Sequence, residues 1–95
     1  MCMSLEIGSL EYKLEFIRKK QLRYTHLGKS FPIHTQCLLY RNDLLIYGET
    51  IIKHEKDKDD PNFAYRLVAE NCLKHINSKY IRSKIRDKLK TLIQY

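Results

Sequence analysis

The chain has 95 residues, of which 43% are hydrophobic and 31% are charged, and its formal net charge at pH 7 is +7. A chain of this length has room for one small core, so residues 1–95 are expected to form a single domain. It contains no apolar stretch of the ~20 residues that a membrane-spanning helix needs and no basic secretory start, so we expect a cytoplasmic protein with no membrane contact.

The first predicted element is residues 10–16, in which apolar and charged residues alternate. This alternation places the apolar side chains on one face of a half-buried β-strand. Leu10, Leu14 and Ile17 also stand at helical spacing, so a helix is the alternative. Residues 18–29 are rich in Lys and Arg without a clear period, and we expect them to form a basic loop.

Residues 33–40 and 44–53 are two runs rich in Ile, Leu, Thr and Tyr. Asn42 and Asp43 lie between them, and both residue types tolerate the positive φ that a tight turn requires. The two runs therefore predict a β-hairpin. Gly48 interrupts the second run and indicates a bulge or a close approach of two backbones.

Residues 54–60 form a charged connector that ends in Asp60 and Pro61, an N-cap residue followed by proline at the first helical position. Apolar residues then recur every three or four positions to the C-terminus, with a break or a second N-cap at Asn77 and Ser78. We expect one long kinked helix or two helices in line. The predicted fold is α+β, with a small antiparallel sheet (a hairpin or a three-stranded meander) in residues 5–54 and a C-terminal helical segment in residues 61–95 packed on it.

The positive charge is concentrated in the last third of the chain. Residues 61–95 hold eight Lys and Arg against two Asp and Glu, whereas residues 1–60 hold ten against nine. Clustered positive charge attracts polyanions, so we predict a non-catalytic protein that binds nucleic acid or another phosphate-bearing ligand. The predicted contacts are Lys79, Arg82, Lys84, Arg86 and Lys90 in the last helix, helped by Arg18, Lys19, Lys20 and Arg23. The alternative for both groups is an ordinary solvated surface.

A row of apolar residues in the same C-terminal segment predicts an interface. The row consists of Ile81, Ile85, Leu89 and Leu92. A helix that runs past a small sheet must bury such a row on itself, on a second copy or on a partner. The alternative function is therefore a homo-oligomeric protein that inhibits a host protein or sequesters a nucleotide, through this row or through the tyrosine-bearing sheet.

Cysteine and histidine residues raise the question of a metal site. His34 and Cys37, together with Cys72 and His75, are ligand types that zinc accepts. Positions three apart on a strand face opposite sides of a sheet, so we expect no zinc site and place both cysteines in the core. The odd number of cysteines fits a reducing compartment. Without a glycine-rich phosphate loop or a nucleophile motif, the sequence predicts neither enzyme activity nor a cofactor.

Residues 33–76 combine a hairpin ending near Gly48, a connector containing His54 and Asp57, and a helix with small residues on its packing face. This combination resembles a group of small proteins encoded by bacteriophages and prophages. The resemblance implies an accessory protein acting on host or phage machinery, such as a counter-defence factor, and it carries over no functional residue. A helix in residues 9–24 would instead give an order similar to that of double-stranded-RNA-binding domains, although acidic residues occupy the place of that family's basic motif.

Overall fold

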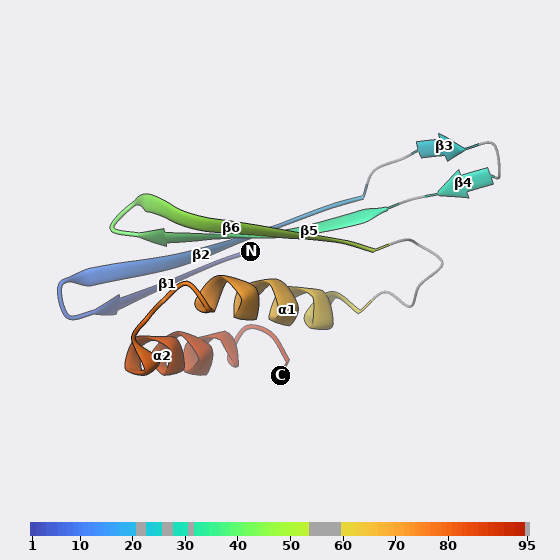
Figure 1. Ribbon diagram of the computed structural model, residues 1–95. Helices are drawn as coiled ribbons and strands as arrows, with labels where there is room; N and C mark the ends of the chain where they lie inside the picture. Colours follow the sequence, from blue (N-terminus) through green and yellow to red (C-terminus); the bar gives the residue numbers. More distant parts are fainter. Residues whose placement is uncertain (21–22, 26–27, 31, 54–59, 95) are drawn as a thin grey trace.

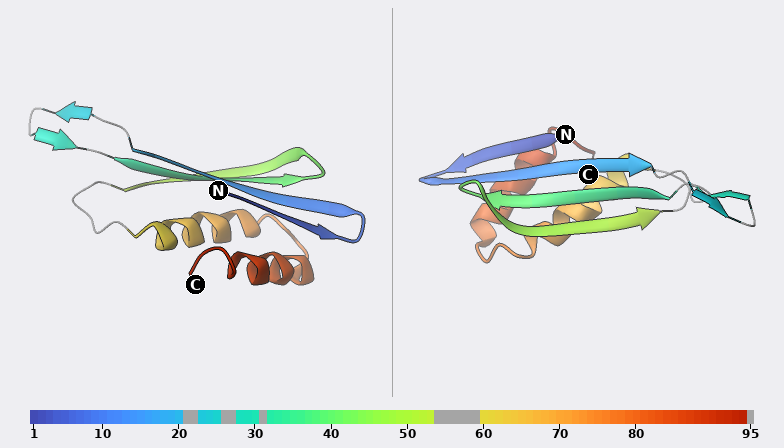
Figure 2. Two further views of the ribbon diagram at one scale, coloured as in Figure 1. Left: turned by 180° about the vertical axis from the view of Figure 1, so that it is seen from behind. Right: turned by 90° about the horizontal axis from the view of Figure 1, so that it is seen from above.

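The computed structural model describes residues 1–20, 23–25, 28–30, 32–53 and 60–94, which form an antiparallel sheet and two helices. The strands of the four-stranded sheet lie in the order β1-β2-β5-β6, and β3 and β4 form a separate two-stranded ribbon. The strands are β1 (Cys2–Ile7), β2 (Leu10–Lys20), β3 (Arg23–Thr25), β4 (Gly28–Ser30), β5 (Ile33–Arg41) and β6 (Leu44–Lys53). The helices are α1 (Pro61–Leu73) and α2 (Lys79–Leu89). Both helices cover the same face of the sheet (Figures 1 and 2), which confirms the predicted α+β class.

The sheet has one more strand than the sequence predicts. β1 pairs antiparallel with β2 along its whole length, and Gly8, with a φ of +62°, lies in the turn between them. Residues 2–7 do alternate in burial, but a strand this short needs its neighbour to form. The strand interpretation of residues 10–16 is confirmed, and the helix alternative, with the domain order that it implied, is wrong.

The expected basic loop is also wrong for the described part of residues 18–29. Arg18, Lys19 and Lys20 belong to the end of β2, and Arg23 begins β3. β3 and β4 pair as a ribbon that continues away from the end of the sheet (Figure 1). The side chains of Lys20 and Arg23 lie outside the described part of the chain.

The predicted hairpin is confirmed as β5 and β6, and its turn has the expected geometry. Asn42 and Asp43 have φ angles of 49° and 64°. The Asn42 side-chain oxygen accepts a hydrogen bond of 2.9 Å from the Glu11 amide, and the Asn42 amide donates one of 2.8 Å to the Glu11 carbonyl. The turn is therefore held to β2 as well as being favoured by its own sequence.

The bulge expected around Gly48 is present just before it, whereas the close approach to the glycine is made by a side chain and not by a second backbone. The pairing register shifts near the start of β6, where Ile46 is left between the pairs that β5 makes with Leu45 and Tyr47. At Gly48 itself, an added Cβ would lie 3.0 Å from Cδ2 of Leu38. The bulge thus precedes the glycine, and the close approach occurs over it.

The helix N-termini follow the sequence prediction, but the direction of α2 does not. Asp60 caps α1 by accepting a hydrogen bond of 3.1 Å from the Asn62 amide, and Ser78 caps α2 by accepting one of 3.3 Å from the Ile81 amide. After the turn, α2 runs back beside α1 instead of continuing in line (Figures 1 and 2). Residues 54–59, most of the predicted connector, lie outside the described residues.

The core lies between the sheet and the helix pair. The sheet contributes Met3, Tyr12, Leu14, Phe16, Cys37 and Leu39, and the helical side contributes Val68, Ala69, Cys72, Leu73, Ile76, Ile85, Leu89 and Ile93. Phe16 of β2 meets Tyr65 of α1 edge to face, with ring centroids 5.4 Å apart. None of the described helices combines the length and apolar character that crossing a bilayer requires.

Candidate nucleic-acid interface

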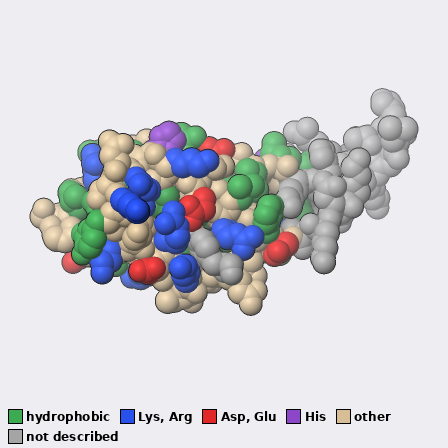
Figure 3. Space-filling model, turned by 60° about the horizontal axis from the view of Figure 1, so that its bottom comes forward, with side chains coloured by type: hydrophobic (Ala, Val, Ile, Leu, Met, Phe, Trp, Pro, Cys, Tyr) green, Lys and Arg blue, Asp and Glu red, His purple; other side chains and the backbone are tan. Residues whose placement is uncertain are grey.

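The basic residues of α2 lie on the solvent side of the helical layer. Lys79 and Lys84 are exposed, and so is Lys90 just beyond the helix end. Figure 3 shows this side of the molecule, where Lys and Arg side chains gather over the helices with acidic side chains among them. The structure therefore brings the predicted C-terminal residues onto one surface.

Two members of this predicted set have structural roles. Nε and Nη2 of Arg86 donate to the two carboxylate oxygens of Glu70 on α1, each at 2.8 Å. Arg82 donates through Nη1 to the carbonyl oxygen of Ile76, in the turn between the helices. Both arginines are partly buried, and they hold α2 against the end of α1.

One of the exposed lysines, Lys84, lies over an aromatic ring. Tyr80 keeps 63% of its surface accessible on the outer side of α2. Nζ of Lys84 lies 5.4 Å from the centroid of this ring, within the range of a cation–π contact. Asp87 is exposed on the same helix. An exposed ring beside lysines can stack on a base while the ammonium groups meet phosphates. The sequence offers Tyr80 only as one of several tyrosines suited to an interface, because the fold is needed to show which side of α2 is free.

Charge is segregated between the two layers of the fold. Within the described residues, the helical layer from Asp60 onward holds eight Lys and Arg against three Asp and Glu. Residues 1–20 and 32–53, which build the sheet, hold six against five. The positive field of this protein therefore originates mainly in the helical layer.

The two predicted basic groups do not form one surface. Arg18 and Lys19 lie at the end of β2 next to the β3-β4 ribbon, whereas α2 lies under the opposite end of the sheet in both orientations (Figures 1 and 2). Lys19 is exposed, and Arg18 is half-buried. The structure therefore does not bring Arg18 and Lys19 together with the basic residues of α2. One short ligand cannot contact both groups, because they lie at opposite ends of the sheet.

The predicted apolar interface row is largely part of the intramolecular core. Ile85 and Leu89 have no accessible surface, and Ile81 is half-buried against the same cluster. Only Leu92 is exposed, at 46%. The prediction of an interface is thus wrong for Ile85 and Leu89, because α2 folds back and buries them within its own chain.

The cysteines and histidines take the positions that strand geometry predicts. Cys37 points into the core and His34 lies on the open face of β5. Sγ of Cys72 lies 3.4 Å from the carbonyl oxygen of Cys37. The hydrogen bond with Cys72, followed by burial, raises the pKa of the Cys37 thiol. No group of metal-ligating side chains is found among the described residues.

Tyr47 of β6 links the edge of the sheet to the turn that follows α1. Its ring stacks on that of His75, with centroids 3.5 Å apart, and its hydroxyl donates a hydrogen bond of 2.6 Å to Glu49. This hydrogen bond is the main reason why the pKa of Tyr47 is raised above its ordinary value. The contact closes the β6 edge of the core.

Comparisons with protein-family models, with curated proteins and with solved structures found no match. The resemblance of residues 33–76 to small phage proteins therefore stays a prediction.

Proposed function

We propose that this protein is a non-catalytic, nucleic-acid-binding accessory protein whose binding surface is the solvent side of the helical layer. The observation that carries the proposal is the charge segregation, eight basic against three acidic residues in the helical layer and near-neutrality in the sheet. The free thiols of all three cysteines fit action in a reducing compartment such as the cytoplasm.

The chemistry of the surface fits a phosphate backbone with accessible bases. Lys79, Lys84 and Lys90 supply mobile ammonium groups that release counterions when they meet phosphates. Tyr80 supplies a flat ring for one base, which favours single strands over duplexes because only an unpaired base can stack on it. The arginines position the helix that carries these groups.

Fluorescence anisotropy with a labelled single-stranded oligonucleotide at low salt tests the proposal. Changing both Lys79 and Lys84 to Glu should weaken binding by about 10- to 100-fold, with a shallower salt dependence, because two phosphate contacts become repulsive. Neither lysine makes a hydrogen bond or ion pair with another described residue, so the fold should be retained.

The matched control is Lys13→Glu on the open face of the sheet, compared with the single change Lys84→Glu, which alters the net charge equally. Lys13 also lies over a tyrosine ring, as Lys84 does, with Nζ 5.2 Å from the centroid of Tyr40. An equal loss of binding in both variants would show that net charge alone attracts the oligonucleotide and would contradict the assignment of the surface.

Self-association through the sheet is the second candidate function, and the exposure of β6 favours it. β6 is an edge strand, and Leu44 and Ile52 keep 74% and 56% of their surfaces accessible. A free edge with apolar side chains can pair with a second copy of itself. Light scattering tests this function. A dimer that persists at high salt and does not bind oligonucleotides would favour it over nucleic-acid binding, with a host protein or a nucleotide as the target.

A further inference from the structure

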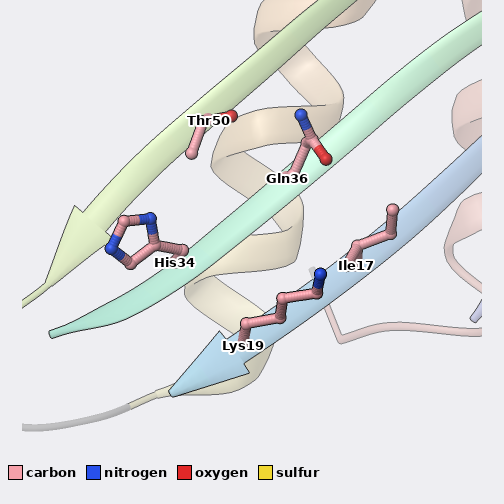
Figure 4. A pocket seen from close by; sticks show the side chains of 5 residues that line it. All are labelled: Ile17, Lys19, His34, Gln36 and Thr50. Atoms are coloured by element: carbon pink, nitrogen blue, oxygen red, sulfur yellow. The ribbon is translucent and has the colours of Figure 1, made fainter. Parts of the chain in front are cut away.

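The open face of the sheet carries a hollow of about 200 Å³ at the end away from the β5-β6 turn. Figure 4 shows the five side chains that line it, all rising from the same face of three neighbouring strands. They are Ile17 and Lys19 of β2, His34 and Gln36 of β5, and Thr50 of β6. The helices lie behind the sheet, so this hollow is separate from the surface proposed for nucleic acid.

The backbone register alone explains why these residues meet. Lys19 pairs with His34, Ile17 pairs with Gln36, and Gln36 pairs in turn with Thr50. Directly paired side chains on one face of a sheet lie close together. The site is therefore built by regular strands and does not depend on a loop.

Every polar group in the hollow can donate a hydrogen bond. Lys19 offers an ammonium group, His34 a ring N–H, Gln36 an amide NH₂ and Thr50 a hydroxyl. Among the described residues none of these four side chains has a hydrogen-bond or ion-pair partner, and no carboxylate lines the hollow. Gln36 and Thr50 can accept as well as donate, but four donors, one of them positively charged, with no carboxylate beside them favour an anionic ligand rich in acceptor oxygens.

A phosphoryl group matches this arrangement better than a carboxylate does. Its three terminal oxygens point in different directions and can meet donors from three strands, whereas the two carboxylate oxygens lie in one plane. The volume is below the roughly 300 to 1,000 Å³ of sites that enclose a whole small molecule. The hollow therefore suits a head group, with the remainder of the ligand lying over the open face of the sheet.

Apolar groups beside the donors indicate what the remainder is. Ile17 forms one wall, and Ile52, which pairs with His34, is exposed next to the hollow. We propose that the hollow binds the phosphoryl group of a nucleotide, with its sugar or base resting on these side chains. Free nucleotides and nucleotide units of a single strand share this chemistry.

Amide NMR of the ¹⁵N-labelled full chain tests the proposal with four probes. Inorganic phosphate and a nucleoside 5′-monophosphate should give saturable shifts at Lys19, His34, Gln36 and Thr50, whereas the nucleoside without phosphate should give much smaller ones. A single-stranded oligonucleotide distinguishes the source: stronger shifts in the hollow than those of the monophosphate identify a strand as the ligand, and weaker ones identify a free nucleotide.

Lys19→Glu should weaken the binding of the monophosphate by about tenfold or more, since it removes a charged hydrogen bond. Lys13→Glu on the same face of β2 is the matched control and should leave the affinity unchanged. Thr50→Val, which keeps the shape of the side chain, provides a second variant with a smaller expected loss.

Two results would overturn the proposal: no shift in the hollow with any phosphate-bearing probe at millimolar concentration, or equal losses in Lys19→Glu and Lys13→Glu. Neither result would decide whether the helical layer binds nucleic acid, because binding there is detected by amide shifts in residues 74–90.

Discussion

Ile85 and Leu89 have no exposed surface, whereas Leu92, one turn further along, remains 46% exposed. Residues of the same apolar row therefore contribute very differently to the free energy of unfolding. Removing buried methyl groups costs both their transfer free energy and a cavity, while an exposed leucine has little to lose.

We expect Ile85→Ala to lower the free energy of unfolding by about 2 to 5 kcal/mol. Leu92→Ala should change it by about 0.5 kcal/mol or less. Urea denaturation followed by circular dichroism measures both values. Equal, small effects would mean that Ile85 is not packed within its own chain, as the original interface hypothesis required.

The basic residues of α2 also differ in whether they already have a partner within the protein. The sequence places Lys79, Arg82 and Arg86 on one helical stripe, but it cannot tell which of them is already engaged. The partner of Arg86 is Glu70, sixteen positions earlier, and only the fold brings the two together. For this reason we leave the arginines unchanged in the binding test.

At the scale of elements, the Glu70–Arg86 pair connects α1 and α2. The two side chains are 31% and 34% exposed, so solvent screens the pair, while its two parallel hydrogen bonds strengthen it. A double-mutant cycle with Glu70→Gln and Arg86→Met should give a coupling free energy of ~0.5 to 1.5 kcal/mol in favour of the pair.

Lys79→Met serves as the control for this cycle, because Lys79 has no ion-pair partner among the described residues. It should show no coupling with Glu70→Gln. A coupling of zero for Glu70 and Arg86 themselves would mean that the helices are aligned by apolar packing alone.

The elements show how far local patterns determine this fold. Alternation in residues 10–16, the turn at Asn42 and Asp43, and the caps Asp60 and Ser78 were all predictable, because each depends on residues close in sequence. The strand β1 and the reversal of α2 were not, since both depend on partners that are distant in the chain. The break at Asn77 indicates that a helix ends, but the packing of α2 determines where the next one goes.

The hollow on the open face also depends on contacts between residues that are distant in the chain. Alternation could place Lys19, His34 and Thr50 on one face of their own strands, yet the register between the strands brings them together. The register between β5 and β6 is set by their turn and by the bulge near Ile46, whereas Lys19 depends on the separate pairing of β2 with β5. The site is therefore visible only after folding.

At the scale of the whole molecule, the thiols report how cooperative the fold is. Cys37 and Cys72 lie fully buried between β5 and α1, whereas Cys2 is exposed. The side-chain hydrogen bond with Cys72 and then burial raise the pKa of Cys37, which keeps its thiol protonated and unreactive. An aromatic disulfide reagent should therefore label Cys2 at once and the two buried thiols only as the domain unfolds.

Cys2→Ser should remove the fast phase completely and leave the slow one. Rapid labelling of all three thiols in native buffer would show that the helix pair opens from the sheet without global unfolding, and it would contradict a single cooperative core.

The positive charge of the whole molecule is gathered on the helical layer, and we propose that nucleic acid binds there. The most direct measurement is amide NMR of the labelled chain with a single-stranded oligonucleotide at low and at moderate salt. Shift changes should concentrate in residues 74–90, include Tyr80, and fade as salt increases. Shifts confined to the open face of the sheet, or no shifts at low salt, would contradict the claim.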